Sequence, residues 1–101
     1  MTETRYGQAI VRLVRARALK RAAKLAWWNA AAAAGFCTGT DRDDGARCYQ
    51  QRKATALWCP SCQARSEPHA AYRAASAKAA GALRTVLALG RALASSEVEQ
   101  P

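Results

Sequence analysis

The sequence predicts an all-α protein in which two long helices form an antiparallel hairpin. Residues 4–34 contain no proline and a single glycine, and consist mainly of the helix-favouring alanine, leucine, arginine and lysine. Residues 66–95 have a similar composition and an apolar repeat with helical spacing. Between them, residues 35–62 hold turn-forming stretches and all four cysteines. A chain of 101 residues suffices for one domain, which we expect to cover residues 1–101.

The first helix is expected over residues 4–34, and Gly35 is a natural helix end because glycine readily adopts a left-handed conformation. At about 100° per residue, five apolar side chains share one stripe of this helix. That stripe is the predicted packing face, and it comprises Val11, Val14, Ala18, Ala22 and Leu25, with Phe36 continuing it past the end.

A basic face is predicted beside this stripe. Its residues are Arg17, Lys20, Arg21 and Lys24, which have i, i+3, i+4 and i+7 spacing, with Trp28 at its border. Adjacent helical residues point about 100° apart, so Trp27 and Trp28 cannot both face the same seam. Either one is buried beside the loop and the other is exposed for stacking or docking, or both pack under the loop.

The second helix is expected over residues 66–95, with Ser66 as its cap and Pro68 in its first turn. A start at Cys62 with a kink at Pro68 is the alternative. A seam with alternating steps of three and four runs along this helix, through Tyr72, Ala75, Ala79, Leu83, Val86, Gly90 and Leu93. We expect residues 96–101 to form a mobile tail.

The four cysteines are the clearest chemical signal. Cys59 and Cys62 form a Cys-x-x-Cys pair, and Cys37 and Cys48 precede it at even intervals. A Cys-x-x-Cys pair directs two thiolates at one ion, and two further thiolates complete the tetrahedral shell that zinc prefers. With four sulfur ligands no position is left for a reactive water. We therefore predict a structural zinc ion that clasps the loop between the helices.

The four cysteines and His69 allow three alternatives to a four-cysteine zinc site. Two disulfides would require an oxidising compartment, but Arg5, Arg12 and later basic residues interrupt any apolar signal segment, so we expect a cytoplasmic protein. Residues 58–62 resemble the active-site pentapeptide of thioredoxin-type oxidoreductases, which requires a strand that this sequence does not predict. His69 could replace one cysteine as a ligand, although a first-turn residue without a metal is the simpler interpretation.

No catalytic set accompanies the cysteines. Asp41, Asp43, Asp44 and Gly45 do not match a calcium loop, because the glycine is one position early and Arg52 occupies the place of the bidentate glutamate. His69 has no evident nucleophile partner, and no glycine-rich phosphate loop is present. We expect a non-enzyme with an acidic turn at residues 41–45, and the composition excludes a membrane span.

The net charge of +9 is concentrated at the start of the chain, where residues 1–36 carry +6. Six side chains of the first helix would neutralise phosphates of a nucleic acid, namely Arg12, Arg15, Arg17, Lys20, Arg21 and Lys24. Two other interpretations are a solvated basic surface and docking onto an acidic protein with Trp27 or Trp28 as anchor. A hairpin of two helices also leaves outer apolar surface, which favours a homodimeric four-helix bundle.

Residues 58–65 (WCPSCQAR), followed by His69 and an alanine-rich helix, resemble small four-cysteine proteins of temperate bacteriophages. The resemblance covers roughly residues 25–95. It implies an accessory or regulatory protein, and no defined activity. Because many such proteins act on host nucleic-acid machines, the second functional expectation is a modulator or inhibitor of a nucleic-acid-processing complex, of the anti-CRISPR or anti-restriction class.

Overall fold

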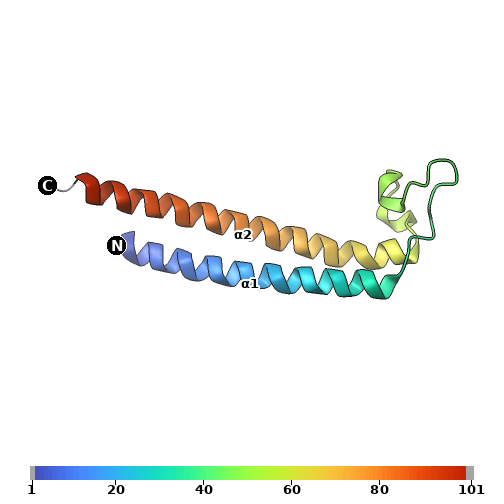
Figure 1. Ribbon diagram of the computed structural model, residues 1–101, viewed down its shortest axis with the longest axis horizontal. Helices are drawn as coiled ribbons and strands as arrows, with labels where there is room; N and C mark the ends of the chain where they lie inside the picture. The colour runs from blue at the N-terminus through green and yellow to red at the C-terminus, as the bar shows by residue number, and fades with distance from the viewer. Residues whose placement is uncertain (1, 100–101) are drawn as a thin grey trace. The chain divides into compact units, whose positions relative to one another are not determined.

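The computed structural model describes residues 2–99. Helix α1 spans Thr2–Ala34 and helix α2 spans Pro60–Glu99. Two short 3-10 helices lie between them, η1 at Cys48–Gln50 and η2 at Thr55–Leu57. No strand forms among residues 2–99. The predicted all-α hairpin is confirmed, as Figure 1 shows by tracing α1 through the connecting segment into α2.

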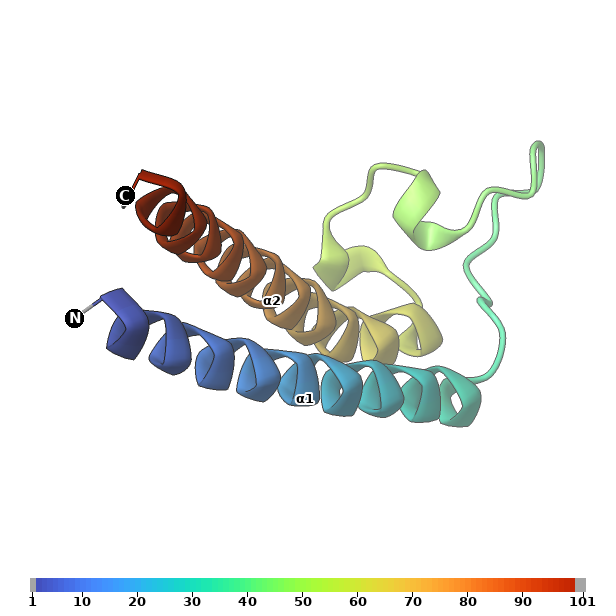
Figure 2. The ribbon, with the colours of Figure 1, turned by 60° about the vertical axis from the view of Figure 1, so that its left-hand side comes forward.

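The chain forms two compact units, and both long helices contribute to each. The first unit comprises the chain up to Arg21 and from Ala74 onward, and the second comprises residues 22–73. The connecting segment therefore belongs entirely to the second unit. Figure 2 shows it leaving the end of α1 and passing through both 3-10 helices to the start of α2.

A stripe of mostly small residues on α1, here called the inner stripe, packs against α2. It follows alternating steps of three and four. In the first unit it comprises Tyr6, Ala9, Leu13, Ala16 and Lys20, and in the second Ala23, Trp27, Ala30 and Ala34. Ala9 and Leu13 are buried and the others are half-buried. Small side chains at such spacing let two helices approach closely.

The prediction of the packing face of α1 is wrong, because the residues of that stripe are exposed. Val11 is 48% exposed, Val14 60%, Leu25 58% and Phe36 90%, and Ala18 and Ala22 are exposed as well. Both stripes have heptad-like spacing, and the predicted one is more hydrophobic. The inner stripe was overlooked because alanine contributes little hydrophobicity and Lys20 interrupts it, although small residues are what close helix packing requires.

The predicted seam of α2 is confirmed, because every one of its seven residues is buried or half-buried. Ala79 is 7% exposed. A Cβ atom placed on Gly90 would lie 3.5 Å from Cε2 of Tyr6, which shows that α1 and α2 are in contact there. In the first unit the seam of α2 therefore meets the inner stripe of α1.

The ends of the helices are partly as expected. Gly35 ends α1 with a φ of +76°, whereas α2 begins at Pro60 rather than near Ser66. Proline suits a first helical position because its missing N–H would have no partner there, and the N–H of Gln63 donates to the Cys59 carbonyl at 2.9 Å. Pro68 lies inside α2.

At its other end, α2 continues four residues beyond the expected end at Ser95. The predicted tail is thus helical as far as Glu99, and residues 100–101 of that tail lie outside the described residues. None of the described helices carries an apolar stretch of sufficient length to cross a bilayer.

Candidate metal centre

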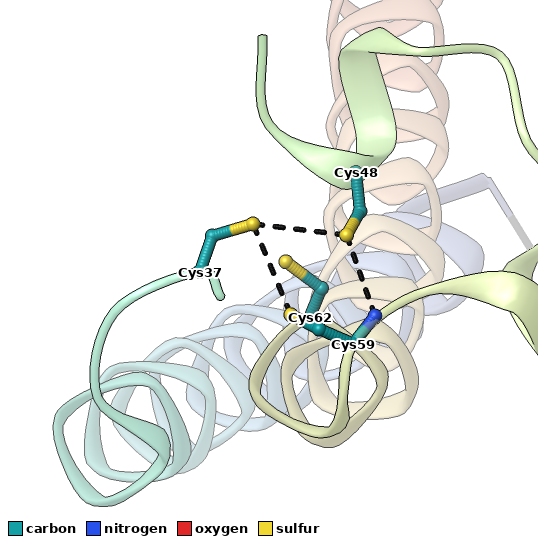
Figure 3. Close-up of side chains that lie close together, drawn as sticks. All are labelled: Cys37, Cys48, Cys59 and Cys62. Carbon is teal, nitrogen blue, oxygen red and sulfur yellow. Dashed lines mark hydrogen bonds between the residues drawn. The ribbon is translucent and has the colours of Figure 1, made fainter. Parts of the chain in front are cut away.

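The four cysteine side chains meet in the second unit. Cys37 follows the end of α1, Cys48 begins η1, and Cys59 and Cys62 flank the start of α2. All four Sγ atoms lie within 4.8 Å of one another and could hold a metal ion. Figure 3 shows the sulfur atoms converging from these three parts of the chain. The convergence predicted from the spacing is therefore observed.

The sulfur atoms are in van der Waals range rather than bonded. The Sγ of Cys37 lies 3.7 Å from that of Cys48 and 3.8 Å from that of Cys59. A disulfide requires about 2.05 Å between the two sulfur atoms, and all four cysteines are free. Cys48 and Cys62 are buried, with exposed fractions of 1% and 5%, and the other two are half-buried.

Backbone N–H groups stabilise two of the thiolates. The N–H of Cys62, in the first turn of α2, lowers the pKa of the Cys59 thiol to about 5, with further donors from Thr38 outweighing the opposite effect of burial. The N–H of Cys48 is the main cause that lowers the pKa of Cys37. The N–H of Cys59 donates to the Sγ of Cys48 at 3.3 Å.

The remaining sulfur resists ionisation. Burial, followed by the neighbouring thiols, raises the pKa of Cys62 to about 12. Four sulfurs at this spacing cannot all carry negative charge unless a cation lies among them. The cluster therefore combines thiolates held by hydrogen bonds with a buried thiol that would ionise only beside a metal ion.

Two residues outside the predicted set shape the cluster. A Cβ atom on Gly39 would lie 2.7 Å from the Sγ of Cys48, so only glycine fits beside this sulfur. Gln51 donates through Nε2 to the carbonyls of Gly39 at 2.7 Å and Ala46 at 2.6 Å, which ties the segment after Cys37 to the segment around Cys48. The sequence indicated neither the close approach at Gly39 nor the role of Gln51.

The end of α1 is fastened to the start of α2 next to the cluster. Ser61 donates through Oγ to the carbonyl of Ala34 at 2.7 Å. Arg65 donates through Nη2 to the carbonyl of Gly35 and, at 3.4 Å, to that of Ala31. These carbonyls have no helical donor of their own, and a cation near them is favoured by the helix dipole. Ser61 lies between the two cysteines of the Cys-x-x-Cys pair.

His69 is not part of the cluster. Its ring centroid lies 4.7 Å from that of Trp27, which also stacks on Tyr72 at 5.4 Å. Of the two adjacent tryptophans, Trp27 therefore packs in the inner stripe, while Trp28 is 55% exposed. Nζ of Lys24 lies 4.7 Å from the Trp28 ring centroid, a cation–π contact.

The acidic residues form the expected turn. Asp41 accepts through Oδ1 the N–H groups of Asp43 at 2.8 Å and Asp44 at 3.3 Å, and Asp44 accepts that of Ala46 at 2.8 Å. The carboxylates thus satisfy backbone donors of their own loop. Gly45 completes the turn with a φ of +71°.

The six basic residues predicted to contact phosphates do not share a single face, although Arg17, Lys20, Arg21 and Lys24 lie within about 100° of one another as predicted. Arg12, Arg15, Arg17 and Arg21 are exposed, whereas Lys20 lies half-buried in the inner stripe and Lys24 is half-buried in the second unit. At about 100° per residue, Arg12 and Arg15 lie on one side of α1, and Arg17 and Arg21 on the other. The charge therefore surrounds the outside of the helix.

Comparison with known proteins assigns the chain to no family. No protein-family model matches the chain, and neither a curated protein nor a solved structure is significantly similar to it. The resemblance to four-cysteine phage proteins stays a prediction.

Proposed function

We propose that the four cysteines bind one structural Zn²⁺ and that the protein is a non-catalytic binding module for nucleic acid. The sulfur geometry supports zinc. Four sulfurs at about 2.3 Å from a tetrahedral ion lie about 3.8 Å from one another, and Sγ of Cys37 lies 3.7 Å from that of Cys48 and 3.8 Å from that of Cys59. Four protein ligands close the shell and leave no position for substrate.

The small hydrophobic core gives the zinc ion a structural role. Among the described residues, the buried side chains are Ala9, Leu13 and Ala79 in the first unit and Cys48 and Cys62 in the second. In the second unit, no described side chain is buried other than those of these two cysteines. Zinc binding to such sites contributes about 10–16 kcal/mol to folding, which is more than so few buried side chains supply.

The charge of the first unit is the observation that supports nucleic-acid binding. Its nine basic residues are Arg5, Arg12, Arg15, Arg17, Lys20, Arg21, Lys78, Arg84 and Arg91. The unit also contains three acidic residues near the ends of the chain, Glu3, Glu97 and Glu99, so its net charge is +6. A surface with this excess of positive charge attracts polyanions, and nucleic acid is the polyanion whose phosphates such residues neutralise.

Charge removal tests this function. The triple variant Arg12→Gln, Arg15→Gln, Arg17→Gln should bind a random-sequence DNA duplex more weakly, with the slope of log affinity against log salt reduced by about 3. The matched control removes three exposed charges from the connecting segment of the second unit, by Arg42→Gln, Arg47→Gln and Lys53→Gln. Absence of wild-type duplex binding in low salt, or equal losses in both variants, would contradict the proposal.

A second candidate function is modulation of a protein, in keeping with the expected inhibitor of a nucleic-acid machine. The exposed Val11 and Val14 favour it, because apolar side chains on the outside of a helix gain nothing from phosphates. Trp28 offers a further exposed anchor in the second unit. Binding to host protein that survives nuclease treatment would support this function, provided that the Val11→Ser, Val14→Ser variant loses it.

A further inference from the structure

The outside of α1 in the first unit carries a second helical seam. Gly7, Val11, Val14 and Ala18 follow steps of four, three and four, and all four are exposed. Val11 is 48% and Val14 60% exposed. We call Val11, Val14 and Ala18 the outer stripe. A shallow hollow on the Arg12 and Arg15 side of this stripe is lined by Thr4, Gly7, Gln8, Val11, Arg12 and Arg15. Apolar residues at heptad spacing are typical of a surface that packs against another helix.

Arginine flanks the outer stripe on both sides. At about 100° per residue, Arg12 and Arg15 follow one side, and Arg17 and Arg21 the other. In helix pairs, residues that flank the apolar seam select the partner by charge. A helix docked on this stripe must therefore present acidic side chains on both sides of its own apolar seam.

A second copy of this chain does not meet that requirement. Residues 4–21 and 74–96 contain no acidic residue, so two outer stripes placed face to face would bring arginine against arginine. Like charges across an interface disfavour pairing. The expected four-helix dimer is therefore opposed by charge at this face, and the partner is foreign.

We propose that the outer stripe binds an amphipathic helix of another protein, with acidic residues on both sides of the apolar seam of that helix. This inference rests on the second candidate function and names its partner class. The same arginines would contact phosphates under the first function, so an acidic helix and a nucleic acid should compete for α1.

A synthetic peptide of about three heptads tests the proposal, with leucine at the seam positions and glutamate at the flanking positions. Fluorescence anisotropy of the labelled peptide measures its affinity for the full chain. The variant Val11→Ser, Val14→Ser should bind about tenfold more weakly. The matched control is Leu87→Ser, which changes another exposed apolar residue of the same unit, 47% exposed on α2, and should bind as the wild type does.

A charge swap keeps the test independent of any damage to folding. The variant Arg15→Glu, Arg21→Glu should lose the glutamate peptide and gain a peptide with lysine at the flanking positions. The proposal would be overturned if the wild type did not bind the glutamate peptide, or if it bound the glutamate and lysine peptides equally. Unchanged binding of the glutamate peptide by the Val11→Ser, Val14→Ser variant would also overturn it. Duplex binding that depends on Val11 and Val14, without peptide binding, would assign the stripe to nucleic acid and leave the first function standing.

Discussion

Backbone N–H groups and one glycine determine how closely the four sulfurs approach. The N–H of Cys62 stabilises the Cys59 thiolate, the N–H of Cys59 donates to Cys48, and Gly39 leaves room for the Cys48 sulfur. Groups that orient the ligands of a metal in this way commonly change its affinity by about 10–100-fold when they are altered. One substitution follows from the position of Gly39.

The substitution Gly39→Ala should weaken zinc binding by about tenfold or more, since its Cβ would lie 2.7 Å from the Sγ of Cys48. Competition with a chromophoric chelator measures the zinc dissociation constant. Gly7→Ala is the control, because no atom lies within 4 Å of a Cβ at that position. If both variants bind zinc equally well, Gly39 has no part in shaping the site.

Arg65 should stabilise the protein by its hydrogen bonds to carbonyl groups at the end of α1. It donates to the Ala31 and Gly35 carbonyls, and hydrogen bonds to charged groups contribute about 1.5–3 kcal/mol. Because Arg65 is half-buried, solvent screening reduces the contribution of these hydrogen bonds. Arg65→Gln should therefore lower the free energy of unfolding of the zinc-loaded protein by about 1 kcal/mol. Arg73→Gln, which changes an exposed arginine of the same helix, is the comparison. Equal urea midpoints for the two variants would exclude this role.

At the scale of single residues, the sequence predicted which cysteines come together, but not the hydrogen bonds around them. A metal site could be predicted from the thiol side chains and the spacing of Cys37, Cys48, Cys59 and Cys62. The contacts of Ser61, Arg65 and Gln51 depend on which carbonyl lies opposite each side chain. That information exists only after the chain has folded, so no local pattern could reveal it.

At the scale of the helices, α1 carries two stripes with helical spacing, and hydrophobicity selects the wrong one. The inner stripe consists of alanine with Leu13, Lys20 and two aromatic residues, while the outer stripe holds the valines. On α2 the leucine, valine and small residues of the seam fall on the same side of the helix, so hydrophobicity and small size both indicate the packed face. The start of α2 at Pro60 lies two residues before the alternative start at Cys62, and the sequence left the choice open because Ser66 and Pro68 also form a plausible helix start.

The packed seams should tolerate no larger side chain. Ala79→Leu should lower the free energy of unfolding by about 1–3 kcal/mol, because added volume in a packed contact forces neighbours apart. Ala79 is 7% exposed, whereas its neighbour Ala80 is exposed. Ala80→Leu should therefore change stability by less than about 0.5 kcal/mol. Urea denaturation of both zinc-loaded variants distinguishes them, and equal losses would contradict the assigned seam.

At the scale of the whole molecule, metal binding and folding should be coupled. Few side chains are buried among residues 2–99, and the cysteine cluster joins the end of α1, η1 and the start of α2. The cysteine spacing predicted a structural metal ion that clasps the loop, and a dependence of folding on the metal follows from that prediction. The division into two units was not predictable, because it follows from contacts between distant parts of the chain.

Removal of the metal should abolish the cooperative unfolding transition of the second unit. Circular dichroism during heating, with reduced protein before and after exhaustive chelation, measures the effect. Zinc sites of this type contribute about 10–16 kcal/mol, so re-addition of Zn²⁺ should restore the transition. The variant Cys48→Ser should behave like the chelated protein and be insensitive to chelator. An unchanged melting curve after complete metal removal would show that the fold does not depend on the ion.

X-ray absorption spectroscopy at the zinc edge of protein purified under reducing conditions tests the central claim most directly. The account predicts one zinc per chain with a single shell of four sulfur atoms at about 2.3 Å and no nitrogen or oxygen ligand. A shell of three sulfurs with one lighter atom, less than one metal ion per chain after loading, or sulfur bound only to sulfur would contradict it.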